Sequence, residues 1–215
     1  MGIIKTISRP TKGFLLLSSF SALLILIRYL KATELFGFGL LWNLFLAGLP
    51  VFFALVAGRL IEKRKLAWLF TGLWLLFYPN SAYIITDLVH LDHLPRQLWW
   101  YDSLGIFHVA FTGLLLGLYS VWIIHTRVLS RLVSGIWLWP LILISMILSG
   151  YGIYLGRFLR FNSWDIFSDP ASLFISSVLH LKNPLAIKMT LLFSAMQFVV
   201  YLSYWLQKQE TYESA

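Results

Sequence analysis

The 215-residue sequence contains no cysteine, and only 12% of its residues are charged. Without a thiol, the chain cannot form disulfides, iron–sulfur clusters or thiolate zinc sites, and it has no cysteine nucleophile. An average soluble domain carries about 25% charged residues, so the scarcity of charge excludes an ordinary soluble domain. It also excludes disorder, which requires low hydrophobicity and a high density of charge.

Hydrophobic residues make up 59% of the chain and aromatic residues 17%. They are gathered in apolar runs near the length of about 20 residues that a spanning helix needs. This pattern predicts an all-α integral membrane protein, a bundle of about six transmembrane helices that forms a single polytopic domain over residues 1–215. We expect the spans at residues 14–30, 35–58, 66–86, 104–125, 133–156 and 185–206.

The third expected span is unlike the others because its apolar part, residues 66–78, is too short to cross a bilayer alone. It must continue through Pro79 and Asn80, and a proline inside a helix removes a hydrogen bond and clashes with the preceding turn. The sequence therefore predicts a third helix that is broken at Pro79.

The formal net charge is +8, but lysines and arginines lie between the apolar runs instead of clustering on one face. This layout argues against nucleic acid as a partner and indicates orientation in a bilayer. The larger share of the 17 basic residues falls on the side of both termini, most densely in residues 59–65. We therefore expect both termini in the cytoplasm, in a plasma (inner) membrane, with the loops before the fourth and sixth spans on the outer face.

One polar motif follows the break in the third span. If this segment is helical, then Asn80, Tyr83, Asp87 and His90 share one face, because they are spaced i, i+3, i+7 and i+10. Ionisable residues at membrane depth are costly and usually functional, so Asp87 and His90 are candidates for an acid–base pair. They could also be two metal ligands, but two ligands do not establish a metal site, and no cofactor is clearly implied. In the structural alternative, Asp87 caps a helix, His90 lies among the headgroups, and Asn80 bonds backbone groups freed by Pro79.

A second, basic motif follows the fifth span, where Arg157, Arg160 and Trp164 again fall at i, i+3 and i+7. Guanidinium groups bind phosphate and carboxylate through paired hydrogen bonds, so this motif is typical of an oxyanion or lipid-headgroup site. Three polar, turn-forming residues accompany it: Asn162, Ser163 and Asp165. In the structural alternative, the arginines extend to the interface, Trp164 belongs to the aromatic belt, and Asp165 pairs with an arginine.

Other polar residues are expected at the same depth on the outer side. Asp102 precedes the fourth span and could face Arg157 or Arg160, His108 lies on the fourth span, and Asn43 lies in the outer half of the second. This convergence predicts a single site. We expect catalytic roles for Asp87, His90, Asp102 and His108, and substrate binding by Asn80, Tyr83, Arg157, Arg160, Asn162, Trp164 and Asp165.

The two motifs, Pro79-Asn80-Ser81-Ala82-Tyr83-x-x-Thr86-Asp87-x-x-His90-Leu91 and Gly156-Arg157-Phe158-x-Arg160-x-Asn162-Ser163-Trp164-Asp165, resemble the signature of the domain-of-unknown-function family 1361. The resemblance extends from about the second span to the sixth. It implies a multi-pass bacterial inner-membrane protein and gives no reaction.

The residues favour a membrane enzyme with its site on the outer face, acting by acid–base chemistry on a lipid-linked or envelope substrate. In this hypothesis the arginines hold an anionic lipid headgroup or a phosphate, and the bilayer itself is the other partner. Two alternatives stay open. A transporter or channel could use the broken third helix, and a non-catalytic scaffold could use buried ion pairs to lock its loops together.

Overall fold

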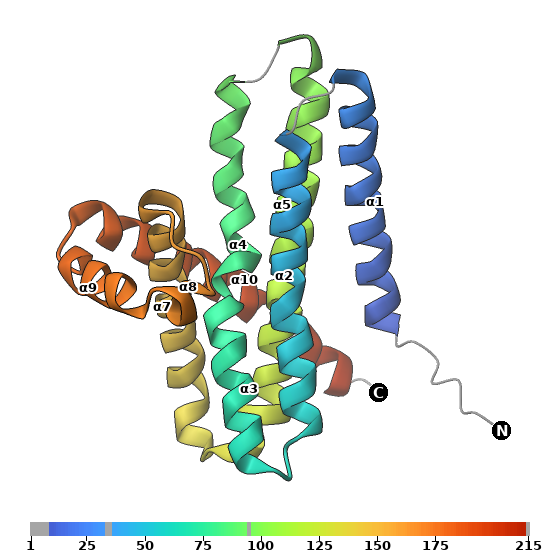
Figure 1. Ribbon diagram of the computed structural model, residues 1–215. Coiled ribbons are helices and arrows are strands. Elements are labelled where there is room, and N and C mark those ends of the chain that lie inside the picture. The colour runs from blue at the N-terminus through green and yellow to red at the C-terminus, as the bar shows by residue number, and fades with distance from the viewer. Residues whose placement is uncertain (1–8, 33–35, 94–95, 214–215) are drawn as a thin grey trace.

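The computed structural model describes residues 9–32, 36–93 and 96–213, and within them every regular element is helical (Figure 1). Residue 35, at which the second expected span begins, lies outside the described residues. Five helices carry most of the bundle: α1 (Arg9–Ala32), α2 (Phe36–Arg59), α5 (Trp99–Ile123), α7 (Leu138–Leu159) and α10 (Pro184–Glu213). The shorter helices are α3 (Arg64–Phe77), α4 (Pro79–Tyr83), α6 (Ser130–Leu132), α8 (Asp165–Ser168) and α9 (Pro170–His180). Three 3₁₀ segments, η1 (Ile84–His93), η2 (Arg96–Leu98) and η4 (Gly135–Trp137), and a π-helical segment, η3 (Ile124–Leu129), complete the chain.

Five helical stretches are long and apolar enough to cross a membrane, as judged by length and composition. This finding confirms the predicted all-α membrane bundle, and the chain is an integral membrane protein. The five stretches are Pro10–Leu30, Gly39–Arg59, Trp99–Leu132, Gly135–Leu159 and Pro184–Lys208.

The third expected span is divided, as its proline predicts. The helix α3 ends at Phe77, α4 begins at Pro79, and from Ile84 onward the chain winds as a 3₁₀ helix. The amide of Asn80 donates to the Phe77 carbonyl at 2.9 Å, so a side chain satisfies a backbone group at the break. In Figure 1, α3 and α4 follow each other in one interrupted rod. The expected α-helical spacing from Asn80 to His90 is therefore wrong beyond Ile84, because a 3₁₀ helix turns every three residues.

Close backbone packing fixes α4 between α5 and α7. A Cβ atom built on Gly113 of α5 would lie 2.8 Å from the Ser81 carbonyl oxygen, and one on Gly117 would lie 2.8 Å from the Ser81 Cβ. On the other side, a Cβ on Gly152 of α7 would lie 2.8 Å from the Pro79 Cγ. Only glycine permits these approaches, so the break in the third segment is held at the centre of the bundle.

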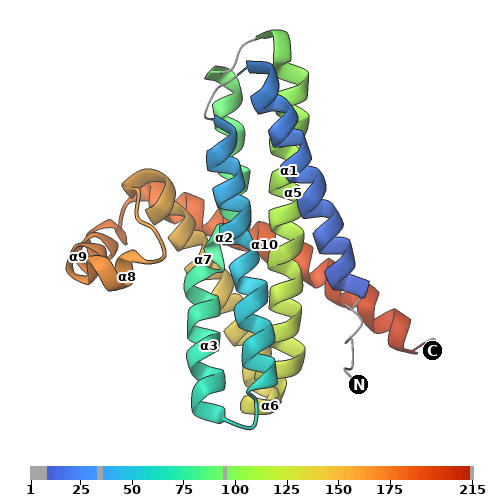
Figure 2. The same ribbon diagram turned by 45° about the vertical axis from the view of Figure 1, so that its right-hand side comes forward.

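The chain between α7 and α10 leaves the bundle. There α8 and α9 form a small lobe beside the long helices, which is visible in both views (Figures 1 and 2). The helix α10 then returns to pack along α7. The lobe was not expected from the sequence, which predicts only a loop between residues 156 and 185.

Candidate functional site

A cavity of about 360 Å³ lies beside the break, where α2, α3, α4 and α7 meet the chain that follows α7. One part of its wall is polar and the other is rich in leucine. Its polar lining consists of Asn43, Asn80, Tyr83, Arg160, Asn162 and Ser163, and its larger apolar residues are Trp42, Leu46, Leu75, Leu76, Pro79, Leu148, Leu155, Phe161 and Leu173. Four predicted substrate-binding residues, Asn80, Tyr83, Arg160 and Asn162, are thus brought to one cavity.

An ion pair between the two motifs lies next to this cavity. The Arg157 Nη1 is 3.2 Å from the Asp87 Oδ1, and the Asp87 side chain is buried. The amide of Asn43, which lines the cavity, donates to the Asp87 Oδ2 at 2.9 Å. A buried carboxylate requires such partners, because an unpaired charge in a low-dielectric interior is strongly destabilising. Asp87 therefore links α2, η1 and α7.

A second contact joins the motifs at the break itself. The Asn80 amide donates to the Ser163 Oγ at 2.9 Å, and the Ser163 hydroxyl donates to the Leu76 carbonyl at 3.1 Å. The loop after α7 is thereby fastened to the end of α3, just before the break.

Arg160 ends α7 in a left-handed conformation, with φ 62° and ψ 27°. It is the single non-glycine residue with positive φ among the described residues. Its N–H and that of Phe161 both donate to the Leu155 carbonyl, which closes the helix in the manner usual for glycine. For an L-residue this conformation costs about 1–2 kcal/mol. Arg160 is exposed and lines the cavity, and within the described residues no hydrogen bond or ion pair engages its guanidinium.

Asp165 and Trp164 shape the polar loop from outside the cavity lining. The Asp165 carboxylate accepts from the Asn162 backbone N–H at 2.7 Å and from the Ser168 hydroxyl at 3.0 Å. The alternative in which Asp165 pairs with an arginine is therefore wrong, because local donors occupy its oxygens. The Trp164 ring lies edge-on to that of Trp42, with centroids 6.0 Å apart, and Trp42 lines the cavity.

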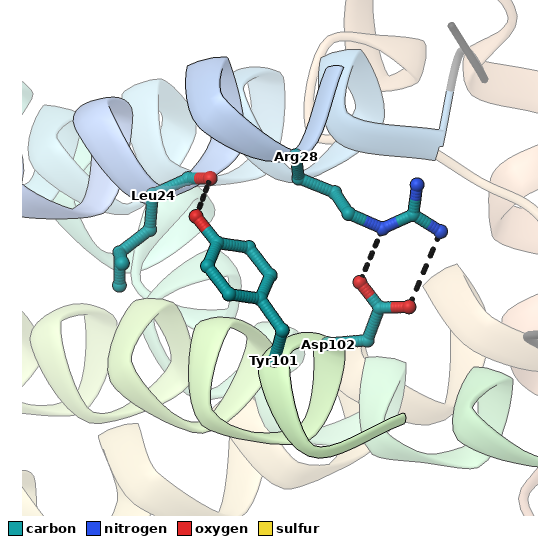
Figure 3. A network of polar contacts seen from close by, with 4 residues as sticks. All are labelled: Leu24, Arg28, Tyr101 and Asp102. Atoms are coloured by element: carbon teal, nitrogen blue, oxygen red, sulfur yellow. Dashed lines mark hydrogen bonds and ion pairs between the residues drawn. The ribbon is translucent and has the colours of Figure 1, made fainter. Parts of the chain in front are cut away.

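Asp102 and His108 lie elsewhere, because both face α1. The Arg28 Nε is 2.5 Å and its Nη2 is 3.2 Å from the two Asp102 oxygens, and the Tyr101 hydroxyl donates to the Leu24 carbonyl at 2.6 Å (Figure 3). The expectation that Asp102 faces Arg157 or Arg160 is wrong, since α1 packs on this side of α5 and brings its own arginine.

His108 makes a similar contact with α1. Its Nε2 lies 3.3 Å from the Leu17 carbonyl oxygen, and its ring meets Phe20 edge-on. The structure thus does not bring Asp102 or His108 to the cavity. The His90 side chain lies outside the described residues. Among the side chains that are described, no group of three or more His, Asp or Glu residues gathers to hold a metal ion.

The apolar lining of the cavity had no part in the sequence-based site, and Trp42 and Leu173 are two examples. Trp42 had a weak signal, because it precedes Asn43 on the same expected span. Leu173 had none, because nothing in the sequence shows that α9 folds back to the cavity.

Comparison with known proteins gives one match. No curated protein and no solved structure matches the chain. A family model described as "Protein of unknown function (DUF1361)" matches residues 42–200, a range that includes every residue lining the cavity. This confirms the family that the two motifs indicate: the chain belongs to the DUF1361 family.

Proposed function

We propose that this integral membrane protein binds a ligand carrying an oxyanion, a phosphate or a carboxylate, in the cavity beside the broken third segment. The observation that carries the proposal is the contrast between two arginines. Arg157 is paired with Asp87, whereas Arg160 lines the cavity without a polar partner in the described structure. An arginine in this state is a bidentate donor for a phosphate or carboxylate.

Two other side chains of the lining can donate to the same ligand. The side-chain amide of Asn162 lines the cavity, and the Asn43 amide has a second N–H beyond the one that it donates to Asp87. The side-chain hydrogens of Asn80 and Ser163 are already donated at the break. Among the side chains that the structure describes, none that lines the cavity is acidic, so the electrostatic field inside it favours an anion.

Acid–base catalysis by Asp87 receives less support from this geometry. Arg157 and Asn43 bind the carboxylate oxygens, and Asp87 is not among the cavity-lining residues. A general base must reach its proton directly or through one water. We therefore infer that Asp87 positions α7, and with it Arg160, rather than exchanging protons with the ligand.

The same proposal includes the orientation of the site. Basic residues concentrate in the α2–α3 loop, and the Arg64 Nη2 donates to the Leu132 carbonyl at 3.1 Å, so this loop and the end of α6 lie at one end of the bundle. The helix α7 begins near α6, and Arg160 follows the other end of α7. Because short basic loops stay in the cytoplasm, we infer cytoplasmic termini in the cell membrane and a cavity toward the extracytoplasmic side.

The test uses the full chain in phosphatidylcholine nanodiscs and native mass spectrometry. Dioleoyl phosphatidic acid and dioleoylglycerol share their tails and differ in the phosphate. We expect retention of phosphatidic acid only, and we expect the Arg160→Gln variant to bind it about 10–100-fold more weakly, since a charged hydrogen bond is worth about 1.5–3 kcal/mol. Arg131→Gln, which removes an exposed arginine of α6, is the matched control. Equal binding by the Arg160 and Arg131 variants would contradict the proposal.

A further inference from the structure

The outward face of α9 is apolar. Phe174, Ile175, Val178 and Leu179 fall on one side of this helix, because they are spaced i, i+1, i+4 and i+5. All four are exposed, Phe174 by 70% and Leu179 by 74%. Phe167 of α8 adds another exposed ring to the lobe.

The inward face of α9 is mostly polar, because Ser176, Ser177 and His180 are half-buried there beside Leu173. The Tyr151 hydroxyl of α7 donates to the Ser177 carbonyl at 2.5 Å, and the Tyr154 hydroxyl lies 2.7 Å from the His180 Nδ1. A helix on the surface of a soluble protein turns its polar side to water and its apolar side inward. The arrangement of α9 is the reverse, and exposed apolar surface of this kind indicates contact with lipid.

The length of α9 determines how it meets that lipid. Its 11 residues extend roughly 16 Å at 1.5 Å per residue, about half of the hydrocarbon core. The helix cannot cross the bilayer, so an apolar side in contact with lipid requires it to lie along the membrane plane.

The lobe also adjoins the cavity. Leu173, on the inner side of α9, lines the cavity wall together with Phe161 and Asn162 from the loop that leads to α8. A cavity of about 360 Å³ is near the lower end of the range of about 300–1,000 Å³ for small-molecule sites. It can therefore enclose a headgroup while a hydrocarbon tail remains outside, on the side of the lobe.

We propose that the α8–α9 lobe lies in the plane of the bilayer, with Phe174 and Leu179 in hydrocarbon, and that the ligand of the cavity is a membrane lipid that enters past this lobe. The oxyanion of the headgroup meets Arg160, and the tail leaves along the side of Leu173. The proposed position of the lobe follows from the exposure and length of α9 alone, whereas the identity of the ligand rests on the proposed function.

The position of the lobe can be tested by site-directed labelling, and the absence of native cysteine makes each introduced cysteine unique. Phe174→Cys places a label on the exposed apolar side of α9, and Ser176→Cys places one two residues away, on the half-buried side. In vesicles that contain nitroxide-labelled phosphatidylcholine, an environment-sensitive fluorophore at position 174 should lose most of its emission. The same fluorophore at position 176 should keep most of it. Val178→Cys repeats the outward measurement if the Phe174 variant fails to fold. Equal quenching on both sides, or none on the outward side, overturns the in-plane lobe.

The source of the ligand needs a second measurement. Dioleoyl phosphatidic acid and glycerol 3-phosphate carry the same phosphate, but only the first has hydrocarbon tails. We expect the protein in nanodiscs to retain phosphatidic acid and to ignore glycerol 3-phosphate at the same concentration. Displacement of phosphatidic acid by equimolar glycerol 3-phosphate would overturn the lipid assignment and leave the proposed function intact. If the protein retains neither compound, the lipid assignment and the proposed function are both overturned. The labels still show where the lobe lies.

Discussion

Asp87 and Arg157 are separated by 70 residues in the sequence, yet the Asp87 Oδ1 and the Arg157 Nη1 lie 3.2 Å apart. This pair joins the 3₁₀ segment after the break to the last turn of α7. It places the loop that carries Arg160 and Asn162 against the opening created by Pro79. The candidate site therefore depends on an ion pair that does not itself line the cavity.

Breaking this ion pair should destabilise the protein strongly. In Asp87→Asn, Arg157 loses its partner in a mostly buried position, and the expected cost is about 3–5 kcal/mol. Thermal unfolding in detergent, followed by size-exclusion chromatography, measures the loss. The double variant Asp87→Asn/Arg157→Gln should recover part of it, because it leaves no buried charge. An Asp87→Asn protein as stable as the wild type would show that the pair is not formed.

Arg160→Gly should raise stability and remove ligand binding at the same time. Glycine adopts the left-handed conformation without the cost of about 1–2 kcal/mol that arginine bears, and each kcal/mol shifts Tm by about 2–4 °C in a chain of this size. The Arg160→Gln protein keeps the strained backbone and is the matched control for the charge. A lower Tm for the glycine variant than for the glutamine variant would contradict the left-handed geometry.

The close approach of α5 to α4 predicts a difference between two glycines of the same helix. Gly113→Ala forces a methyl group to within 2.8 Å of the Ser81 carbonyl oxygen, and overpacking of this kind costs about 1–3 kcal/mol. Gly105→Ala meets nothing within 4 Å and should be tolerated. Parallel Tm measurements of the two variants decide the matter, and equal values would argue against the tight α4–α5 contact.

Asp102 should be separable from the ligand site. Asp102→Asn weakens the contact with Arg28 and should lower Tm, while retention of phosphatidic acid by the folded fraction stays at the wild-type level. Tyr101→Phe removes the neutral hydrogen bond to the Leu24 carbonyl, and this loss should cost about 1 kcal/mol, less than the loss of the ion pair. If Asp102→Asn lost ligand binding at unchanged Tm, Asp102 would be part of the ligand site.

The bundle and its break follow from local sequence, because apolar run length and a proline within a run act on the segment that contains them. The joining of the two motifs was also predictable, since an intramembrane carboxylate must find a cation and Arg157 lies at a similar depth. The partner of Asp102 was not predictable, because the rotation of an apolar helix cannot be read from its sequence when all its faces are apolar.

Two other features also depend on long-range packing. The change to 3₁₀ geometry at Ile84 occurs in a segment packed against α5, and no local signal marks it. The return of α9 to the cavity rests on hydrogen bonds from Tyr151 and Tyr154 of α7, two residues whose sequence context is that of an ordinary span.

The most direct test of the central claim is an experimental structure of the protein in nanodiscs that contain phosphatidic acid. We expect density for a phosphate in the cavity beside the break, within about 3 Å of the Arg160 guanidinium, with Arg157 still paired to Asp87. A cavity without such density, with Arg160 turned away to a carboxylate of the protein, would contradict the proposed oxyanion site.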